Sequence, residues 1–264
     1  MGWWGKLVGG AFGFALGGPL GALLGAALGH GFDRGLQGTA APAPEPGDRE
    51  RVQTAFFAAT FAVMGRIAKA DGRVSPDEIR LAEAVMAEMD LTADLRRAAI
   101  GLFNQGKQAD FDLDAVLEQF RRESHRRHTL IQMFVEIQLQ AAFADGELER
   151  SEEVVLLHIC RRLGVPEFVF RRLAQRIRAE RQFGGAEGGP AAARGTLADA
   201  YAVLGVSERD DPETIKKAYR RLMSQHHPDK LVSKGLPEEM MRLAAQKTRE
   251  IRQAYEQVRQ ARGF

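Results

Sequence analysis

Residues 211–229 read DPETIKKAYRRLMSQHHPD, and this stretch decides the fold of the C-terminal part of the chain. It opens with a helix start signal, because Asp211 suits the N-cap, Pro212 the first helical position and Glu213 the first turn. The positions that follow at helical spacing form one face that is predicted to pack against a core. These positions are Ile215, Ala218, Tyr219, Leu222 and His226.

The stretch ends in a stiff turn. Pro228 has no backbone N–H and disfavours helical geometry at His227, so the helix is predicted to end there. The turn presents His227 and Asp229 beside the other face of the helix, which carries Lys216, Lys217, Arg220 and Arg221. Taken alone, four cations on a helix face are typical of a solvated surface. A rigid turn, however, loses less conformational entropy than a flexible turn when it binds a partner.

Helices are also predicted on both sides of this stretch, over about Leu197–Leu204 and over residues 237–262. The later helix is expected to pair with the basic helix as an antiparallel hairpin, with the turn at its tip. Its predicted packing stripe consists of Met241, Ala244, Ala245, Thr248, Ile251, Tyr255 and Val258.

The C-terminal residues 196–264 resemble a J-domain. The resemblance is carried by Tyr201, Leu204, the basic helix, the His-Pro-Asp tripeptide at 227–229 and the Ala-Tyr-Glu segment at 254–256, all in register. It implies a DnaK-type chaperone as partner, whose ATPase the domain stimulates without supplying hydrolytic groups. It also implies the residues that bind this partner, namely His227, Pro228, Asp229, Lys216, Lys217, Arg220 and Arg221.

The N-terminal residues 1–34 are predicted to be a membrane anchor. No side chain from position 7 to position 29 is charged, and a helix of that length spans roughly 34 Å against a hydrocarbon core of about 30 Å. Glycine recurs every four residues, which lets two helices approach closely and predicts a homodimer. The glycines of this stripe are Gly9, Gly13, Gly17, Gly21 and Gly25. A cleaved signal peptide, a Gly-rich leader and a helix lying in the membrane interface are the alternatives.

Two linkers separate the anchor from the remaining domains. Residues 35–50 form an Ala/Pro-rich tether, and residues 184–195 form a Gly/Ala-rich linker. Residues 51–183 between them show helical periodicity and no strand pattern. The predicted fold class is therefore all-α, with a transmembrane helix, a helical middle domain and a C-terminal helical hairpin.

The middle domain contains a faint internal repeat of the form A-D-G-x5-E. Asp71 and Glu78 belong to the first copy, and Asp145 and Glu152 belong to the second. Each Glu falls in the first turn of a helix, where a negative charge suits the helix dipole, so all four residues fit a simple capping role. This domain resembles the TerB-like domain, and the resemblance implies that the four carboxylates converge on Ca²⁺ or Mg²⁺ instead. No other cofactor is expected.

Several functional classes are excluded by composition. A net charge of +2 over 264 residues argues against a general nucleic-acid binder. The single cysteine, Cys160, excludes an internal disulfide and a zinc site built on paired cysteines. We find no nucleophile–base pair and no phosphate loop, so neither an enzyme nor a small-molecule substrate is expected.

The order of the domains resembles a family of membrane-anchored DnaJ-like co-chaperones of Gram-negative bacteria. The resemblance implies a single-pass protein of the inner membrane with its bulk in the cytoplasm. It further implies a role in envelope-stress signalling or capsule regulation. The alternative hypothesis is a membrane scaffold, or a sensor of a metal or a partner, that acts through the TerB-like domain.

Overall fold

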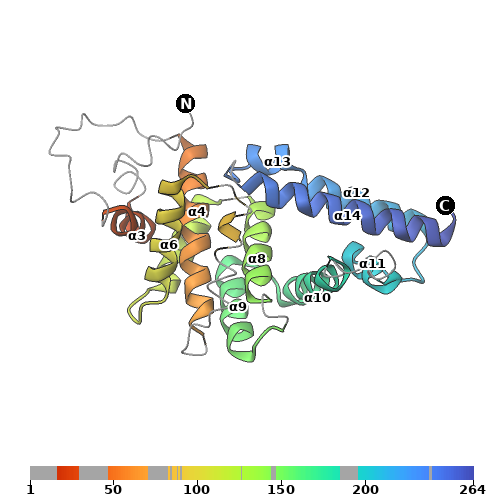
Figure 1. Ribbon diagram of the computed structural model, residues 1–264, viewed down its shortest axis with the longest axis horizontal. Coiled ribbons are helices and arrows are strands. Elements are labelled where there is room, and N and C mark those ends of the chain that lie inside the picture. Colours follow the sequence, from red (N-terminus) through yellow and green to blue (C-terminus); the bar gives the residue numbers. More distant parts are fainter. Residues whose placement is uncertain are drawn as a thin grey trace.

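The chain folds into a bundle of helices and an elongated helical arm (Figure 1). The computed structural model describes residues 17–29, 47–70, 83, 85–87, 89, 91–125, 127–143, 147–184, 196–237 and 240–264. Every element in these residues is a helix, which confirms the all-α class. The bundle contains α4 (Asp48–Ala68), α6 (Ala93–Gly106), α7 (Leu113–Glu123), α8 (His128–Ala142), α9 (Arg150–Leu163) and α10 (Glu167–Gly184).

Helix α4 is the central element of the bundle. Nearly all of its residues after the first turn are buried, because α6, α7, α8 and α9 all pack around it. The ring of Phe56 meets the ring of Phe120 on α7 edge-on at 5.9 Å and the ring of Phe134 on α8 at 6.1 Å. Each of these fully buried rings contributes about 1.5–3 kcal/mol by leaving water. Aromatic rings from three helices thus pack together around α4.

The approach of α4 to α6 is close enough that only glycine fits at two positions. A Cβ atom added to Gly65 would lie 2.0 Å from the carbonyl oxygen of Phe103, and one added to Gly106 would lie 1.8 Å from that of Ala62. Both neighbours are backbone atoms of a helix, so they cannot move aside cheaply. The two glycines thus set the separation of the two helices.

Helix α3 (Gly18–Gly29) corrects the predicted bounds of the N-terminal helix. The sequence predicts one helix over residues 7–29, but the helix begins only at Gly18. Gly17 and Gly18 have φ angles of +57° and +60°, a left-handed conformation that glycine adopts without strain, so a right-handed helix does not run through them. None of the helices in the described ranges is both long and apolar enough to cross a bilayer.

Side-chain packing holds α3 against α6 and α7. Leu20 and Leu24 are fully buried in the core of the bundle. Ala27 lies over Gly101 of α6, where an added Cβ atom would come within 2.9 Å of the Ala27 methyl group. The small residues of α3 therefore allow a close contact with a helix of the same chain.

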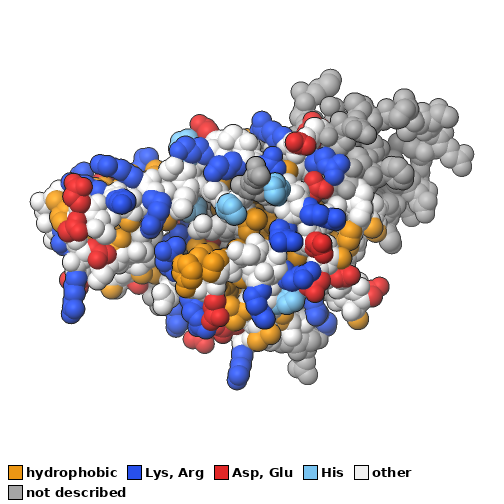
Figure 2. Space-filling model, turned by 180° about the vertical axis from the view of Figure 1, so that it is seen from behind, with side chains coloured by type: hydrophobic (Ala, Val, Ile, Leu, Met, Phe, Trp, Pro, Cys, Tyr) orange, Lys and Arg blue, Asp and Glu red, His pale blue; other side chains and the backbone are white. Residues whose placement is uncertain are grey.

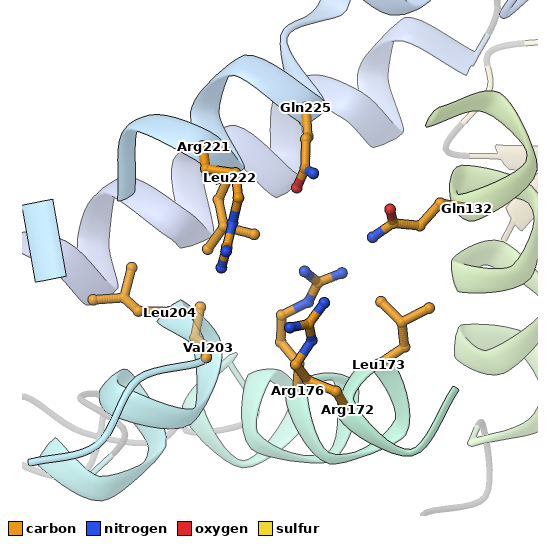
Figure 3. A pocket seen from close by; sticks show the side chains of 10 residues that line it. Gln132, Arg172, Leu173, Arg176, Val203, Leu204, Arg221, Leu222 and Gln225 are labelled. Atoms are coloured by element: carbon orange, nitrogen blue, oxygen red, sulfur yellow. The ribbon is translucent and has the colours of Figure 1, made fainter. Parts of the chain in front are cut away.

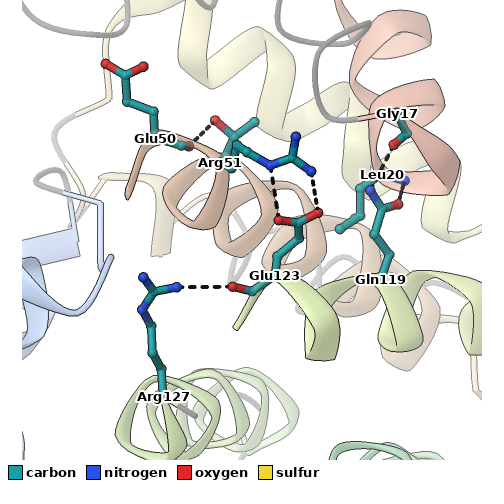
Figure 4. A network of polar contacts seen from close by, with 8 residues as sticks. Gly17, Leu20, Glu50, Arg51, Gln119, Glu123 and Arg127 are labelled. Atoms are coloured by element: carbon teal, nitrogen blue, oxygen red, sulfur yellow. Dashed lines mark hydrogen bonds and ion pairs between the residues drawn. The ribbon is translucent and has the colours of Figure 1, made fainter. Parts of the chain in front are cut away.

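Two polar contacts fix α7 to its neighbours (Figure 4). The Gln119 amide accepts the backbone N–H of Leu20 and donates to the carbonyl of Gly17, both at 2.8 Å, so it caps the start of α3. The guanidinium of Arg51 on α4 donates to both carboxylate oxygens of Glu123. These contacts are partly buried, and they fix the position of α7 between α3 and α4.

The arm consists of four helices: α11 (Leu197–Leu204), α12 (Pro212–His226), α13 (Pro228–Ser233) and α14 (Met241–Arg262). Helices α12 and α14 form an antiparallel hairpin that extends away from the bundle, and α11 packs between α14 and α10 (Figure 1). A second, smaller hydrophobic core joins α11, α12 and α14 and includes Ala179 of α10. Its other buried residues include Tyr201, Leu204, Ile215, Leu222, Ile251 and Val258. The predicted bounds of α11 and α12 are confirmed.

The predicted packing stripe of α14 is partly wrong. Ala244, Ile251 and Val258 are buried as expected, and the half-buried Tyr255 also packs as expected, with its ring stacked on that of Tyr219 of α12 at 4.1 Å. Met241, Ala245 and Thr248 are only half-buried. The buried set includes Leu243, Lys247 and Ala254 in their place. The reason is that α14 packs against α11 and the bundle as well as against α12, which turns a different side of the helix inward.

We predict that Gly65→Ala destabilises the bundle by about 1–3 kcal/mol, because the new methyl group overlaps the α6 backbone. Thermal unfolding of the full chain in detergent measures the effect as a lower Tm. Gly25→Ala is the matched control, since a Cβ atom at this position of α3 meets open space. Equal Tm values for the two variants would show that the close approach of α4 and α6 is not as described.

Candidate functional site

The candidate site lies at the junction of α12 and α13. Asp211 caps the start of α12, where its carboxylate accepts the backbone N–H of Thr214 at 2.9 Å and the Thr214 hydroxyl at 2.8 Å. These hydrogen bonds lower the pKa of Asp211. The helix ends at His226, and His227 is extended with φ −61° and ψ 123°, as predicted from Pro228. Pro228 then occupies the first position of α13, so the His-Pro-Asp tripeptide spans a helix–helix junction and not a loop.

The two polar side chains of the tripeptide face solvent. His227 is 48% exposed and Asp229 is 84% exposed, and the imidazole Nδ1 lies 4.0 Å from a carboxylate oxygen of Asp229. The hydroxyl of Ser224 on α12 receives a hydrogen bond of 2.6 Å from the Lys230 ammonium group, which braces α13 against α12. The junction therefore presents an imidazole and a carboxylate on a backbone held by helices on both sides.

The predicted cations lie along the exposed side of α12. Lys217, Arg220 and Arg221 are exposed, whereas Lys216 is half-buried with its ammonium group 5.4 Å from the centroid of the Phe264 ring. Figure 2 shows Lys and Arg side chains gathered along the arm, which points to the left in that view. The structure thus brings His227, Asp229 and the α12 cations together on one helix and its end.

The chain that follows the tripeptide packs into the bundle. Leu231, Leu236, Met240 and Leu243 belong to the same hydrophobic core as α4 and α8. The side-chain amide of Gln53 on α4 donates to the carbonyl of Leu236 at 3.3 Å. The junction end of the hairpin is therefore attached to the bundle, and sequence analysis did not predict this attachment.

Four charged or titratable side chains are buried where the arm meets the bundle. They are Glu136 of α8, Arg176 of α10, His226 of α12 and Lys247 of α14, each less than a tenth exposed. The Glu136 carboxylate accepts a hydrogen bond from the Arg176 guanidinium and lies 3.7 Å from Nδ1 of His226. The Gln132 amide also donates to Glu136, at 3.2 Å. One carboxylate thus joins residues of the bundle and of the arm.

Burial and neighbouring charges set the protonation of this cluster. Burial by itself raises the pKa of Glu136, but the charges of Arg176, His226 and Lys247 outweigh it and lower the pKa to about 2. Burial lowers the pKa of His226 to about 4, in spite of the nearby carboxylate. At neutral pH the carboxylate is therefore ionised and the imidazole is neutral. Neither ring nitrogen of His226 has a hydrogen-bond partner in the described part of the chain.

The sequence carries one signal for this cluster, although the apolar spacing that predicts the helices does not reveal it. Glu136 is the only acidic residue within α8, which is otherwise apolar or neutral after its first position. A lone carboxylate in an apolar helix requires a buried cationic partner, because an unpaired buried charge is strongly unfavourable. The spacing of charged and apolar residues along the sequence, however, does not identify Arg176 or Lys247 as that partner.

The remaining predicted site residues are only partly described. Gly9 and Gly13 lie outside the described residues, while Gly21 is buried and Gly25 is exposed on α3. Self-association through the glycine stripe therefore stays a prediction.

The predicted cation site is even less completely described. Asp71, Glu78 and Asp145 lie outside the described residues. The carboxylate of Glu152 accepts the backbone N–H of Glu149 at 3.0 Å, as part of a capping box at the start of α9. No group of three potential metal ligands occurs within the described ranges. A Ca²⁺ or Mg²⁺ site thus also stays a prediction, and the capping interaction seen at Glu152 fits the simpler interpretation.

Comparison with known proteins identifies all three segments of the chain. Residues 199–262 match the profile of the DnaJ domain, residues 57–175 that of the tellurite resistance protein TerB, and residues 1–39 that of the co-chaperone DjlA transmembrane domain. The fold and the exposed tripeptide thus define a co-chaperone of the J-domain class, with a membrane anchor and a TerB domain.

Full-length relatives identify the family within this class. The chain is 47% identical to the co-chaperone protein DjlA of Coxiella burnetii, 46% to that of Photorhabdus laumondii and 44% to that of Shewanella oneidensis. Each alignment covers 100% of both chains. The chain therefore belongs to the DjlA family of co-chaperones. No solved structure matches it.

We predict that the stability of the fold decreases as the pH falls from about 6.5 to 4, partly because of His226. Its pKa is about 4 in the folded protein against 6.5 ordinarily, so in this window the unfolded chain binds the extra proton. The shift corresponds to a loss of about 3 kcal/mol below pH 4. His226→Leu should flatten the dependence of Tm on pH between 6.5 and 5.5, above the range in which Glu136 takes up most of its proton in the unfolded chain.

Thermal unfolding across this pH range is the measurement, and His125→Leu is the control because His125 is exposed. The control should retain the wild-type slope. A His226→Leu variant with the same slope as wild type would show that His226 is not a buried neutral imidazole.

Proposed function

We propose that this protein binds a DnaK-type chaperone through the α12–α13 junction and stimulates its ATPase. The observation that carries the proposal is the orientation of the tripeptide. His227 and Asp229 face solvent at the end of a helix whose exposed side carries Lys217, Arg220 and Arg221. The match to the DnaJ domain and the co-chaperone name of the full-length relatives support the same partner.

The chemistry of the site suits recognition of an acidic surface. The exposed cations attract such a surface at a distance and raise the rate of encounter, while His227 and Asp229 supply directional contacts at the end of the helix. The chaperone provides the groups that hydrolyse ATP. The co-chaperone acts by binding one conformational state of the chaperone more tightly than the other, which shifts the equilibrium toward hydrolysis.

Attachment to the bundle prepares the site for binding. The segment after the tripeptide is part of the bundle core, and the side-chain amide of Gln53 donates a hydrogen bond to its backbone at the carbonyl of Leu236. Lys234 adds a hydrogen bond of 2.9 Å to the Thr129 hydroxyl of α8. Because the junction is already ordered, less conformational entropy is lost when the chaperone binds.

The proposal extends to location and assembly. The match of residues 1–39 to a co-chaperone transmembrane domain supports an anchor in the membrane. Because the partner consumes ATP, we place the bulk of the chain on the cytoplasmic side of the inner membrane. Homodimerisation through the glycine stripe, and a role in envelope-stress signalling or capsule regulation, belong to this proposal.

We predict that His227→Gln abolishes stimulation of DnaK while the helix content is unchanged. The imidazole is half-exposed and belongs to neither hydrophobic core, so its loss removes a contact with the partner and not with the fold. Single-turnover ATP hydrolysis by DnaK, with full-length protein in nanodiscs, measures the effect. His125→Gln is the control and should stimulate like wild type; full stimulation by His227→Gln would refute the proposed mechanism.

We predict that charge reversal at the exposed side of α12 slows association with the chaperone. Arg220→Glu should lower the association rate by about tenfold at low ionic strength, and the difference should shrink as salt is added. Stopped-flow binding at several salt concentrations measures it. Arg252→Glu reverses an exposed charge on α14 and serves as the control. Equal effects of both variants would mean that net charge matters and the α12 surface does not.

A further inference from the structure

We propose that a cavity between the bundle and the arm binds a phosphate-type oxyanion through Arg172, Arg176 and Arg221. This inference goes beyond the chaperone-binding function proposed above; the two sites share Arg221, so the test below uses Arg172, which lies outside the chaperone-binding surface. The cavity has a volume of about 80 Å³ and lies among α8, α10, α11 and α12. That volume is sufficient for several water molecules and therefore for a tetrahedral ion of phosphate size.

The polar side chains around the cavity converge from three helices (Figure 3). The guanidinium groups of Arg172 and Arg176 extend from α10 into the space, and Arg221 reaches it from α12 on the opposite side. The amide groups of Gln132 and Gln225 lie at the edge toward α8 and the end of α12. Five donor-bearing side chains thus point toward one small volume.

The charge at this cavity is not balanced by the protein. Glu136 is buried beside it and accepts a hydrogen bond from Arg176. Within the described residues, Arg172 and Arg221 form no ion pair or hydrogen bond through their side chains. Three guanidinium groups therefore surround the cavity with a single carboxylate nearby. Since two of these guanidinium groups have no carboxylate partner among the described residues, an anion in the cavity would gain charge-assisted hydrogen bonds from them.

The donor set favours phosphate over a carboxylate. A guanidinium group donates two parallel hydrogen bonds to a pair of phosphate or carboxylate oxygens. A carboxylate has two oxygens in one plane, whereas guanidinium groups from opposite walls match the oxygens of a tetrahedral ion. The remaining wall is apolar and strengthens these interactions by excluding water; it consists of Leu173, Val203, Leu204 and Leu222.

The same ligand chemistry has two possible sources. One is inorganic phosphate in solution, and the other is the phosphomonoester headgroup of an anionic lipid near the anchor. In both cases the ion would bridge α10 of the bundle and α12 of the arm. Binding would therefore stabilise the docked position of the arm, because a ligand stabilises the state to which it binds.

The test is a calorimetric titration of inorganic phosphate into the full-length protein in phosphatidylcholine nanodiscs. We expect wild type to bind phosphate and Arg172→Gln to bind it about tenfold more weakly or not at all, because a charge-assisted bidentate contact is lost. Arg172 is exposed and lies outside the α12 surface, so the variant should fold normally; circular dichroism and Tm verify this. Added chloride should weaken phosphate binding only modestly at this partly enclosed site.

Arg178→Gln is the matched control, since it removes an exposed arginine from the same helix that does not line the cavity. It should bind phosphate like wild type. Absence of phosphate binding to wild type, or equal binding to Arg172→Gln, would overturn the proposal. Nanodiscs that contain phosphatidic acid distinguish the sources: a lower apparent phosphate affinity there identifies the lipid headgroup, and an unchanged affinity identifies the soluble ion.

Discussion

The ionised carboxylate of Glu136 is the contact on which the position of the arm depends. It is almost completely buried, and it lies among cationic groups that come from α10 of the bundle and from α14 of the arm. Exposed ion pairs contribute at most about 1 kcal/mol, but removal of one partner from a buried pair costs about 3–5 kcal/mol. The reason for this difference is that the buried Arg176 and Lys247 would lose their compensating charge. The main effect of the cluster is therefore to favour one position of the arm on the bundle over other positions, and its net contribution to the stability of the fold is smaller.

Two adjacent histidines show how this arrangement serves recognition. His226 is buried against Glu136, while His227 is half-exposed and extended because Pro228 ends α12. The inward residue and the leucines that follow the tripeptide connect the junction to the bundle. The outward residue remains available to a partner. One of the two adjacent histidines thus contacts the bundle, and the other is exposed to a partner. Contacts with the bundle that fix the backbone at His226 therefore also fix the position of His227.

The sequence was sufficient for features that depend on local signals. Asp211, Pro212 and Pro228 set the start and the end of α12, since caps and prolines act within a few residues. Features that depend on distant contacts were not predictable in this way. Apolar spacing gave the wrong packing side for part of α14, because the side that turns inward depends on α11 and the bundle. Likewise, the apolar character of residues 7–29 did not predict that α3 begins only at Gly18 or that it packs on α6 and α7.

Hydrogen–deuterium exchange of the full-length protein in nanodiscs, compared between wild type and Glu136→Gln at pH 7, tests this account most directly. We expect the variant to lose protection in α13 and in the last turn of α12, while α4 keeps its protection. Glu256→Gln, which alters a half-exposed carboxylate on α14 that pairs with Arg259, should exchange like wild type. Unchanged protection of α13 in Glu136→Gln would contradict the claim that this carboxylate holds the arm on the bundle.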